Sequence, residues 1–196
     1  TIQVIAQNNK IKNYIITVRK ITTEMVFVQG GSFTMGQSST WGGSPEHSAS
    51  VSSYYIGKYE VTYQLWSTVK TWALSNGYSF TNAGVQGKDG SGSTTNQHPV
   101  TTINWYDAVK WCNAISQKEG LTPCYYTNDT FTTIYKTGEV NITTSYVNWN
   151  ANGYRLPTDV EWEFAARNRG VRPGWHPSGD SVFTNVAWFA INSGNI

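Results

Sequence analysis

The first residues of the chain alternate between apolar and polar side chains on either side of an Asn-Asn pair. Ile2, Val4 and Ala6 precede Asn8-Asn9, and Tyr14, Ile16 and Val18 follow it. This alternation predicts a β-hairpin over residues 1–23. Because an isolated hairpin is marginally stable in water, we expect it to be either the end of an upstream domain or an edge added to the main domain, residues 24–196.

Three further apolar runs follow before the first helical segment. Met25 to Val28 and Phe33 to Gly36 flank Gly30-Gly31, which predicts a second hairpin that turns at the glycines. Residues 37–50 are polar and predict a loop. Val51 to Val61 alternates aromatic and polar residues, which predicts another strand.

The rest of the chain contains three segments with the apolar spacing of helices and two long segments without it. The helical segments are residues 63–75, residues 105–119 and a stretch after Thr158, with Thr62, Asn104 and Thr158 as N-caps. Thr158 and Glu161 have the spacing of a capping box. Residues 81–97 have no period and predict a flexible loop. The Tyr- and Thr-rich residues 121–149 predict further β structure.

Composition narrows the classes of protein that fit. The chain has 196 residues, a formal charge of +2 and 13% charged residues, so it has no basic field that would bind nucleic acid. Aromatic residues make up 14%, which is enough bulky apolar surface to form a core. No apolar run is long enough to span a bilayer, and no basic segment followed by an apolar stretch opens the chain, so we expect neither a membrane span nor a signal peptide in it. The polar, weakly charged composition suits an extracytoplasmic protein, but it suits equally any loop-rich fold that contains β structure, and composition alone favours the latter interpretation.

The residue types that most often bind metals are sparse. His47, His98 and His176 are far apart in the sequence, and none has a second ligand at the spacing of a zinc site, so we expect loop or capping roles for them. Cys112 falls on the apolar side of its helix and Cys124 in the loop after it. They are either one buried thiol and one loop thiol, or a disulfide that closes a loop of about a dozen residues.

The carboxylates near the third helix do not form a catalytic pair. Glu161 and Glu163 are two positions apart and leave a helix in different directions. The capping box explains Glu161, and Glu163 is placed to form a modest surface ion pair with Arg167. The residues alone therefore predict an aromatic-rich α+β domain without a visible catalytic constellation.

Five short motifs follow one another in a specific order along the chain. They are Phe33-Thr34-Met35-Gly36, Ser44-Pro45-Glu46-His47, Tyr59-Glu60-Val61-Thr62, His98-Pro99-Val100 with Trp105-Tyr106-Asp107-Ala108, and the stretch from Gly153-Tyr154-Arg155-Leu156-Pro157 to Arg167. In this order they resemble the formylglycine-generating enzyme (sulfatase-modifying factor) family. The resemblance implies an α+β, loop-rich variant of the C-type lectin-like fold, with two to three helices packed on small antiparallel sheets. Two further expectations follow for the signature residues. Arg155 and Glu161 lie in buried or half-buried polar networks, and Trp105, Trp111 and Trp162 fill the core.

The enzymes of this family are copper-dependent oxidases that convert a sulfatase cysteine to formylglycine, and the resemblance makes this the alternative function. Neither Cys112 nor Cys124 matches their catalytic cysteine pair, and Cys112 matches a structural position in the second helix. We therefore expect no copper and no such activity in this chain. The enzymes also bind calcium. Asn185 and Val186 match the start of one such structural site, whose other ligands would follow Ile196, so we expect the main domain to be incomplete at its C-terminus.

A second branch of the same fold resembles the chain more, namely the variable proteins of diversity-generating retroelements, in particular the treponemal ones. The stretch from Ser116 to Tyr125, the N-terminal β segment and the Asn/Tyr/Ser/Trp composition carry this resemblance. It implies a non-enzymatic scaffold that displays ligand-binding residues on a bacterial cell surface as a lipoprotein. Trp175, Trp188 and Phe189 are the candidate binding residues, with anchoring of their loops onto the core as the alternative role.

The same resemblance sets the expectations for partners. We expect an unknown protein or glycan ligand, no nucleic acid, membrane attachment only through an upstream lipid anchor, and a monomer. A purely structural accessory domain is a third hypothesis beside the scaffold and the oxidase.

Overall fold

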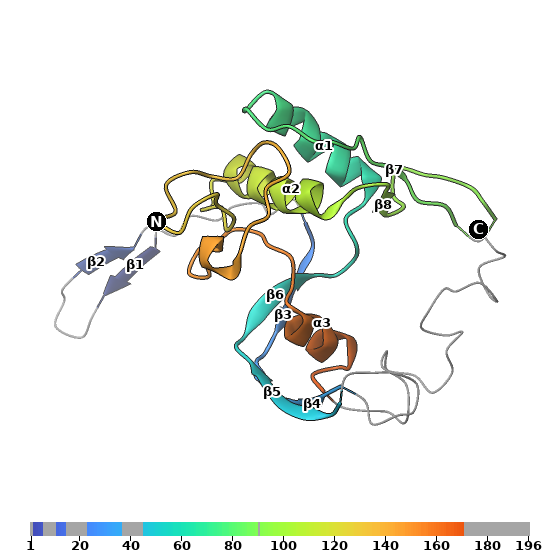
Figure 1. Ribbon diagram of the computed structural model, residues 1–196. Coiled ribbons are helices and arrows are strands. Elements are labelled where there is room, and N and C mark those ends of the chain that lie inside the picture. The colour runs from blue at the N-terminus through green and yellow to red at the C-terminus, as the bar shows by residue number, and fades with distance from the viewer. Residues whose placement is uncertain (1, 6–10, 15–22, 37–44, 90, 171–196) are drawn as a thin grey trace.

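The computed structural model describes residues 2–5, 11–14, 23–36, 45–89 and 91–170 (Figure 1). Its elements are β1 (Ile2–Ile5), β2 (Ile11–Tyr14), β3 (Met25–Val28), β4 (Gly31–Met35), β5 (His47–Val51), β6 (Tyr54–Gly57), α1 (Tyr63–Leu74), β7 (Val85–Gln86), β8 (Val100–Thr101), α2 (Trp105–Lys118), the 3₁₀ turn η1 (Thr144–Tyr146) and α3 (Asp159–Ala166). The strands pair two by two into small antiparallel sheets. This is the loop-rich α+β architecture that the sequence predicts.

β1 and β2 pair with each other in an antiparallel register from Ile2 opposite Tyr14 to Ile5 opposite Ile11. The alternation around Asn8-Asn9 predicts this pairing. Whether the hairpin ends an upstream domain or adds an edge to the main one stays a prediction.

The predicted hairpin turn at Gly30-Gly31 is wrong. β3 pairs with β6 and β4 pairs with β5, and one antiparallel register runs through both pairs, from Met25 opposite Gly57 to Met35 opposite His47. Gly30 lies inside this long ribbon, where a Cβ atom would come within 2.4 Å of the Val51 carbonyl oxygen. The glycine is therefore required for close approach of two backbones rather than for a turn.

The ribbon also extends into the segment predicted as a polar loop. β5 begins at His47, although residues 37–50 carry no apolar alternation. The small polar residues of β5 have a weak intrinsic preference for strands. They form one because β4 supplies the hydrogen-bonded partner, and this tertiary pairing outweighs the local preference.

The three helices begin at the N-caps that the sequence predicts. The hydroxyl of Thr62 accepts a hydrogen bond from Leu65 N, the side chain of Asn104 accepts one from Asp107 N, and Thr158 forms the capping box with Glu161. Each cap satisfies an N–H group that the first helical turn leaves without a partner. Gly120, past the end of α2, has a φ of 69° and ends that helix in the left-handed region.

The larger of two cores lies between α1 and α2, which pack side by side (Figure 1). The rings of Trp66 and Trp111 stack with centroids 5.7 Å apart and planes within 8°. Trp111 Nε1 also donates to the carbonyl of Trp66, so the buried indole N–H has a partner. Val69 and Val109 are fully buried beside them.

The smaller core lies between α3 and the ribbon. Phe164 of α3 meets Phe33 of β4 in an edge-to-face contact with ring centroids 5.1 Å apart, and Val28 completes the buried cluster. α3 contacts both β4 and β5, so the short helix covers one face of the ribbon (Figure 1).

Two of the three tryptophans predicted for the core are exposed. Trp111 is 4% exposed as predicted, but Trp105 is 47% and Trp162 is 60% exposed. Each exposed indole lies two positions from a buried residue, Asp107 in α2 and Phe164 in α3. Because two positions are about 200° apart around a helix, these indoles point away from the cores.

The two long segments between the helices also differ from the prediction. Residues 81–97 are not a featureless loop, since β7 pairs with β8 and Lys88 bridges Thr94. Residues 121–149 contain only isolated bridges and η1 rather than strands. In residues 121–149, backbone groups of Tyr125 and Tyr135 form hydrogen bonds with the side chain of Asn113 in α2. Those backbone groups are then not free to pair with a neighbouring strand.

Within the described residues, none of the helices is both long and apolar enough to span a membrane.

Candidate functional site

α2 carries a stripe of buried polar side chains, Asp107, Lys110 and Asn113, at spacings of three residues. The Asp107 carboxylate accepts hydrogen bonds from the backbone N–H groups of Thr81 and Asn82, each at 2.9 Å. Burial raises the pKa of Asp107, but hydrogen bonds from Asn82 and Thr81 outweigh it and hold that pKa below its ordinary value. An ionised carboxylate thus ties residues 81 and 82 to the helix.

Lys110 is the cation of this stripe. Its Nζ lies 3.5 Å from Asp107 Oδ1 and donates to the carbonyl of Gly138 at 2.9 Å. The same Nζ lies 5.7 Å from the ring centroid of Phe80 and 6.0 Å from that of Tyr135. A buried ammonium group needs such partners to offset the loss of its hydration.

Asn113 fastens the irregular segment after α2 to the helix. Its Oδ1 accepts from Tyr125 N at 3.0 Å, and its Nδ2 donates to the carbonyls of Tyr125 and Tyr135 at 2.7 Å and 3.0 Å. Asn113 is fully buried, so one side chain replaces the ladder that a strand would supply. Sequence reasoning missed this stripe, although polar residues every third position inside an apolar helix are its signal.

Arg155 and Glu161 form the half-buried network that the sequence predicts. The two guanidinium nitrogens of Arg155 each donate to one Glu161 oxygen at 2.6 Å, and Thr158 N donates to Glu161 Oε2 at 2.9 Å. Burial raises the pKa of Glu161, but the hydrogen bonds from Arg155 and Thr158 outweigh it and lower that pKa. The guanidinium carbon also lies 5.2 Å from the ring centroid of Trp149.

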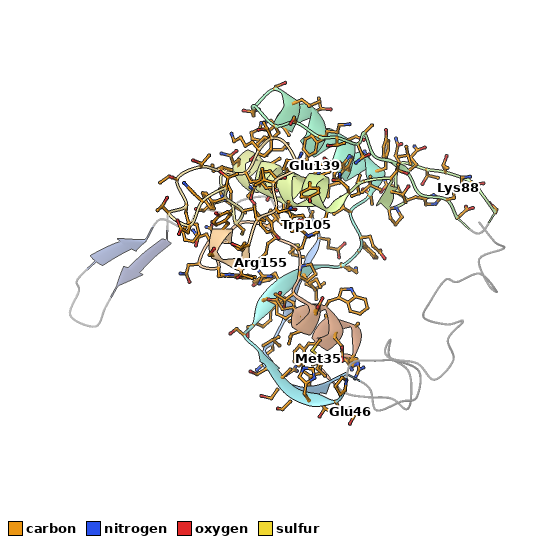
Figure 2. The ribbon with its side chains drawn as sticks, in the orientation of Figure 1. Met35, Glu46, Lys88, Trp105, Glu139 and Arg155 are labelled. Carbon is orange, nitrogen blue, oxygen red and sulfur yellow. The ribbon has the colours of Figure 1, made fainter. Side chains whose placement is uncertain are left out.

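This ion pair connects the two cores. Figure 2 shows Arg155 where the chain passes from the half with α1 and α2 to the half with α3. From the smaller core, the Tyr54 hydroxyl donates to the Glu161 carbonyl oxygen. From the larger core, the Tyr125 hydroxyl accepts from Leu156 N. The junction is therefore held from both sides.

The predicted pair of Glu163 and Arg167 forms, with a nitrogen–oxygen distance of 3.1 Å, but the description of it as a surface pair is wrong. The side chains are 17% and 7% exposed, because the pair lies between α3 and Gly36, whose N–H donates to Glu163 and whose carbonyl accepts from Arg167. Arg167 Nε and Nη1 are buried without a hydrogen-bond partner among the described residues.

Both cysteines are free thiols buried in the larger core, with Cys112 7% and Cys124 1% exposed. Of the two predicted alternatives, the structure has one thiol in the helix and one in the loop after it. The loop thiol, Cys124, is buried as well, which the sequence did not predict. Burial, and then the neighbouring Cys124, raise the pKa of Cys112 to about 12. Enclosed, protonated thiols do not fit a copper site, which needs thiolates that the metal can reach.

The candidate binding residues Trp175, Trp188 and Phe189 lie outside the described residues, as do the candidate calcium residues Asn185 and Val186. Those assignments stay predictions. No cluster of three or more His, Cys, Asp or Glu side chains in the described part of the chain could hold a metal ion.

The histidine predictions can be compared with the structure at two positions. His47 lies in β5 rather than in a loop, and its Nδ1 is 2.9 Å from the carbonyl of Pro45. His98 has the predicted loop position before β8, where its Nδ1 lies 3.0 Å from the carbonyl of Gly87. His176 lies outside the described residues.

Comparison with known proteins gives a family and three relatives. The model of the sulfatase-modifying factor enzyme 1-like domain matches residues 15–195. Chaperone protein LppX of Paenibacillus barcinonensis is 37% identical over 177 residues, which are 89% of this chain and 56% of that protein. Treponema denticola variable protein 1 has a TM-score of 0.65 and 30% identity over 87% of this chain and 62% of its own.

The crystal structure of CarF has a TM-score of 0.59 and 32% identity over 76% of this chain and 57% of its own. This chain therefore spans less than two thirds of the length of each of these relatives. The fold of the described residues and the motifs from Phe33 to Arg167 agree with the family match. The chain belongs to the family of sulfatase-modifying factor enzyme 1-like domains.

Proposed function

We propose that this chain is a non-catalytic scaffold that binds a protein partner. The observation that carries the proposal is that its buried carboxylates are fully engaged by hydrogen-bond donors and cations of the chain itself. Asp107 and Glu161 each face a cation and several hydrogen-bond donors that lower their pKa values. A general acid or base needs a pKa near the working pH, so these carboxylates are suited to stiffening the frame.

The structural relatives support a display role. Treponema denticola variable protein 1 shares the fold at 30% identity, and the residues that would carry binding, Trp175, Trp188 and Phe189, are rigid aromatics of the kind that supply contact area at low entropic cost. The relative named a chaperone favours a protein over a glycan as the partner, because a chaperone acts on polypeptides.

Several companion proposals depend on the same function. The domain works outside the cytoplasm as a monomer on the bacterial surface, attached through a lipid anchor upstream. Calcium is a structural ion of the segment with Asn185 and Val186, and further chain completes the domain after Ile196. The polar, weakly charged composition supports the extracytoplasmic location.

The proposal is tested by selection of a phage-displayed peptide library against the immobilised chain, in parallel with a printed glycan array. A triple variant with Trp175, Trp188 and Phe189 changed to Ala should lose the enriched peptides. The Trp162→Ala variant is the matched control, because this indole is exposed on α3 and is not one of the three candidate binding residues. Binding that persists in the triple variant, or selective binding to glycans alone, would contradict the proposal.

Family membership makes the formylglycine-generating oxidase the second candidate. The copper-loaded protein is mixed with a cysteine-containing sulfatase peptide, and aldehyde is detected with an aminooxy probe. The scaffold proposal expects no aldehyde above a sample without protein. Aldehyde formation would establish the oxidase instead.

A further inference from the structure

The structure brings the two cysteines of the chain into one region through their neighbours. Asn113 and Tyr125 are joined by two hydrogen bonds of opposite direction, Tyr125 N to Asn113 Oδ1 at 3.0 Å and Asn113 Nδ2 to Tyr125 O at 2.7 Å. Cys112 and Cys124 immediately precede these two residues. The side chain of Asn113, next to Cys112, therefore fastens the backbone that follows Cys124 to α2.

Both thiols belong to the same buried cluster. The carbonyl of each cysteine accepts a further hydrogen bond, that of Cys112 from Ser116 Oγ at 2.7 Å and that of Cys124 from Asn148 N at 2.8 Å. Burial, and then the charge of Cys124, raise the pKa of Cys112, and the second contribution requires that Cys124 lie nearby.

We propose that Cys112 and Cys124 form an intramolecular disulfide when the chain folds in an oxidising compartment. This bridge is distinct from any catalytic use of thiols, and it does not depend on the proposed function. It would make the junction between α2 and residues 121–125 covalent, beneath the irregular segment that Asn113 otherwise holds with hydrogen bonds alone.

The reaction is a thiol–disulfide exchange with an external disulfide, either a protein oxidant or a small molecule such as oxidised glutathione. The thiolate of one cysteine attacks the external S–S bond and releases one thiol. The second cysteine attacks the resulting mixed disulfide and releases the second thiol. The two cysteines together lose two protons and two electrons, and the external disulfide takes them up as its S–S bond breaks and two thiols form.

The burial of both thiols determines the stage of folding at which the disulfide can form. Because the folded chain exposes 7% of Cys112 and 1% of Cys124, an oxidant reaches the thiols before the core closes and not afterwards. Once formed, the bridge is equally protected from reductants. The reduced protein, once folded, should accordingly stay reduced in an oxidising buffer for as long as it remains native.

The test uses the unmodified chain, unfolded and reduced, then refolded in oxidised and reduced glutathione or in reductant alone. After refolding, each sample is unfolded in iodoacetamide and analysed by mass spectrometry. We expect no alkylated cysteine and a cross-linked peptide pair from the oxidised sample, and two alkylated cysteines from the reduced one. The oxidised protein should melt about 6–12 °C higher than the reduced protein, since the closed loop is on the order of a dozen residues.

The Cys112→Ala and Cys124→Ala variants are matched controls, because each should melt at the same temperature in both buffers. Two alkylated cysteines after oxidative refolding would overturn the proposal. Stable glutathione adducts or dimers linked between chains would overturn it as well, because they mean that the two thiols do not reach each other. The thiol count on the unmodified chain decides the matter even where a variant does not fold.

Discussion

The Asn113→Ala substitution tests most sharply how α2 organises the rest of the larger core. Asn113 is fully buried and makes three hydrogen bonds to the backbone of Tyr125 and Tyr135. The carbonyl of Tyr125 keeps a second donor, Tyr135 N at 3.1 Å. Alanine therefore leaves the N–H of Tyr125 and the carbonyl of Tyr135 buried without the partners that they have in the native chain.

Each such orphaned group costs about 1–3 kcal/mol. With the small void that the missing amide leaves, we expect a loss of about 3–5 kcal/mol in the free energy of unfolding, which is at the upper end for single substitutions. For a chain of this size that loss lowers the melting temperature by about 6–20 °C. Urea denaturation followed by tryptophan fluorescence measures the change, because the stacked pair of Trp66 and Trp111 lies in the same core.

Two further variants separate the hydrogen bonds from the volume of the side chain. Asn113→Asp keeps an acceptor for Tyr125 N but turns a carboxylate toward two carbonyl oxygens, so it should be at least as destabilising as alanine at pH 7 and recover stability as acidification protonates it. Asn150→Ala deletes the same side chain at an exposed position and should change stability by less than about 0.5 kcal/mol. If Asn113→Ala and Asn150→Ala unfolded at the same urea concentration, the reasoning would be refuted.

Three other substitutions test the ion pair, the ribbon and the smaller core. The pKa of Glu161 is lowered in the folded state, so its contribution to stability is fully present above the ordinary pKa of 4.5 and is lost as pH falls through the folded pKa. The difference in melting temperature between the native chain and Glu161→Gln should therefore shrink as the pH falls below 4.5. A constant difference from pH 7 to pH 3 would contradict the assignment. Gly30→Ala places a Cβ atom 2.4 Å from the Val51 carbonyl and should cost about 1–3 kcal/mol in thermal unfolding, whereas an unchanged melting temperature would show that the strands separate there without cost. Phe164→Ala should cost about 3–5 kcal/mol in urea unfolding, and the exposed neighbour Trp162→Ala should cost almost nothing, so equal losses would place the smaller core elsewhere.

Sequence reasoning succeeded where a local signal fixes a local structure. The N-caps Thr62, Asn104 and Thr158 each lie next to an apolar period, and the three helices begin there. The capping box of Thr158 and Glu161 also forms as its spacing predicts. The network of Arg155 and Glu161 was expected from the family resemblance and not from a local pattern, and the structure contains it.

Sequence reasoning failed where strand pairing or burial depends on residues that are far away in the sequence. Gly30 resembles a turn residue in isolation, and only the partner ribbon shows that it serves close backbone approach. Trp105 and Trp162 are the residues that hydrophobicity alone assigns to a core, yet a shift of two positions on a helix points them outward. The roles of Asp107 and Asn113 were missed because their partners lie in segments without periodicity.

The most direct measurement of the central claim is calorimetric titration of a library-selected peptide into the unmodified chain and into the variant with Trp175, Trp188 and Phe189 changed to Ala. The account predicts saturable binding to the unmodified chain, at least a tenfold weaker affinity for the variant and equal melting temperatures for the two proteins. Equal affinity for both proteins, with the fold intact, would contradict it.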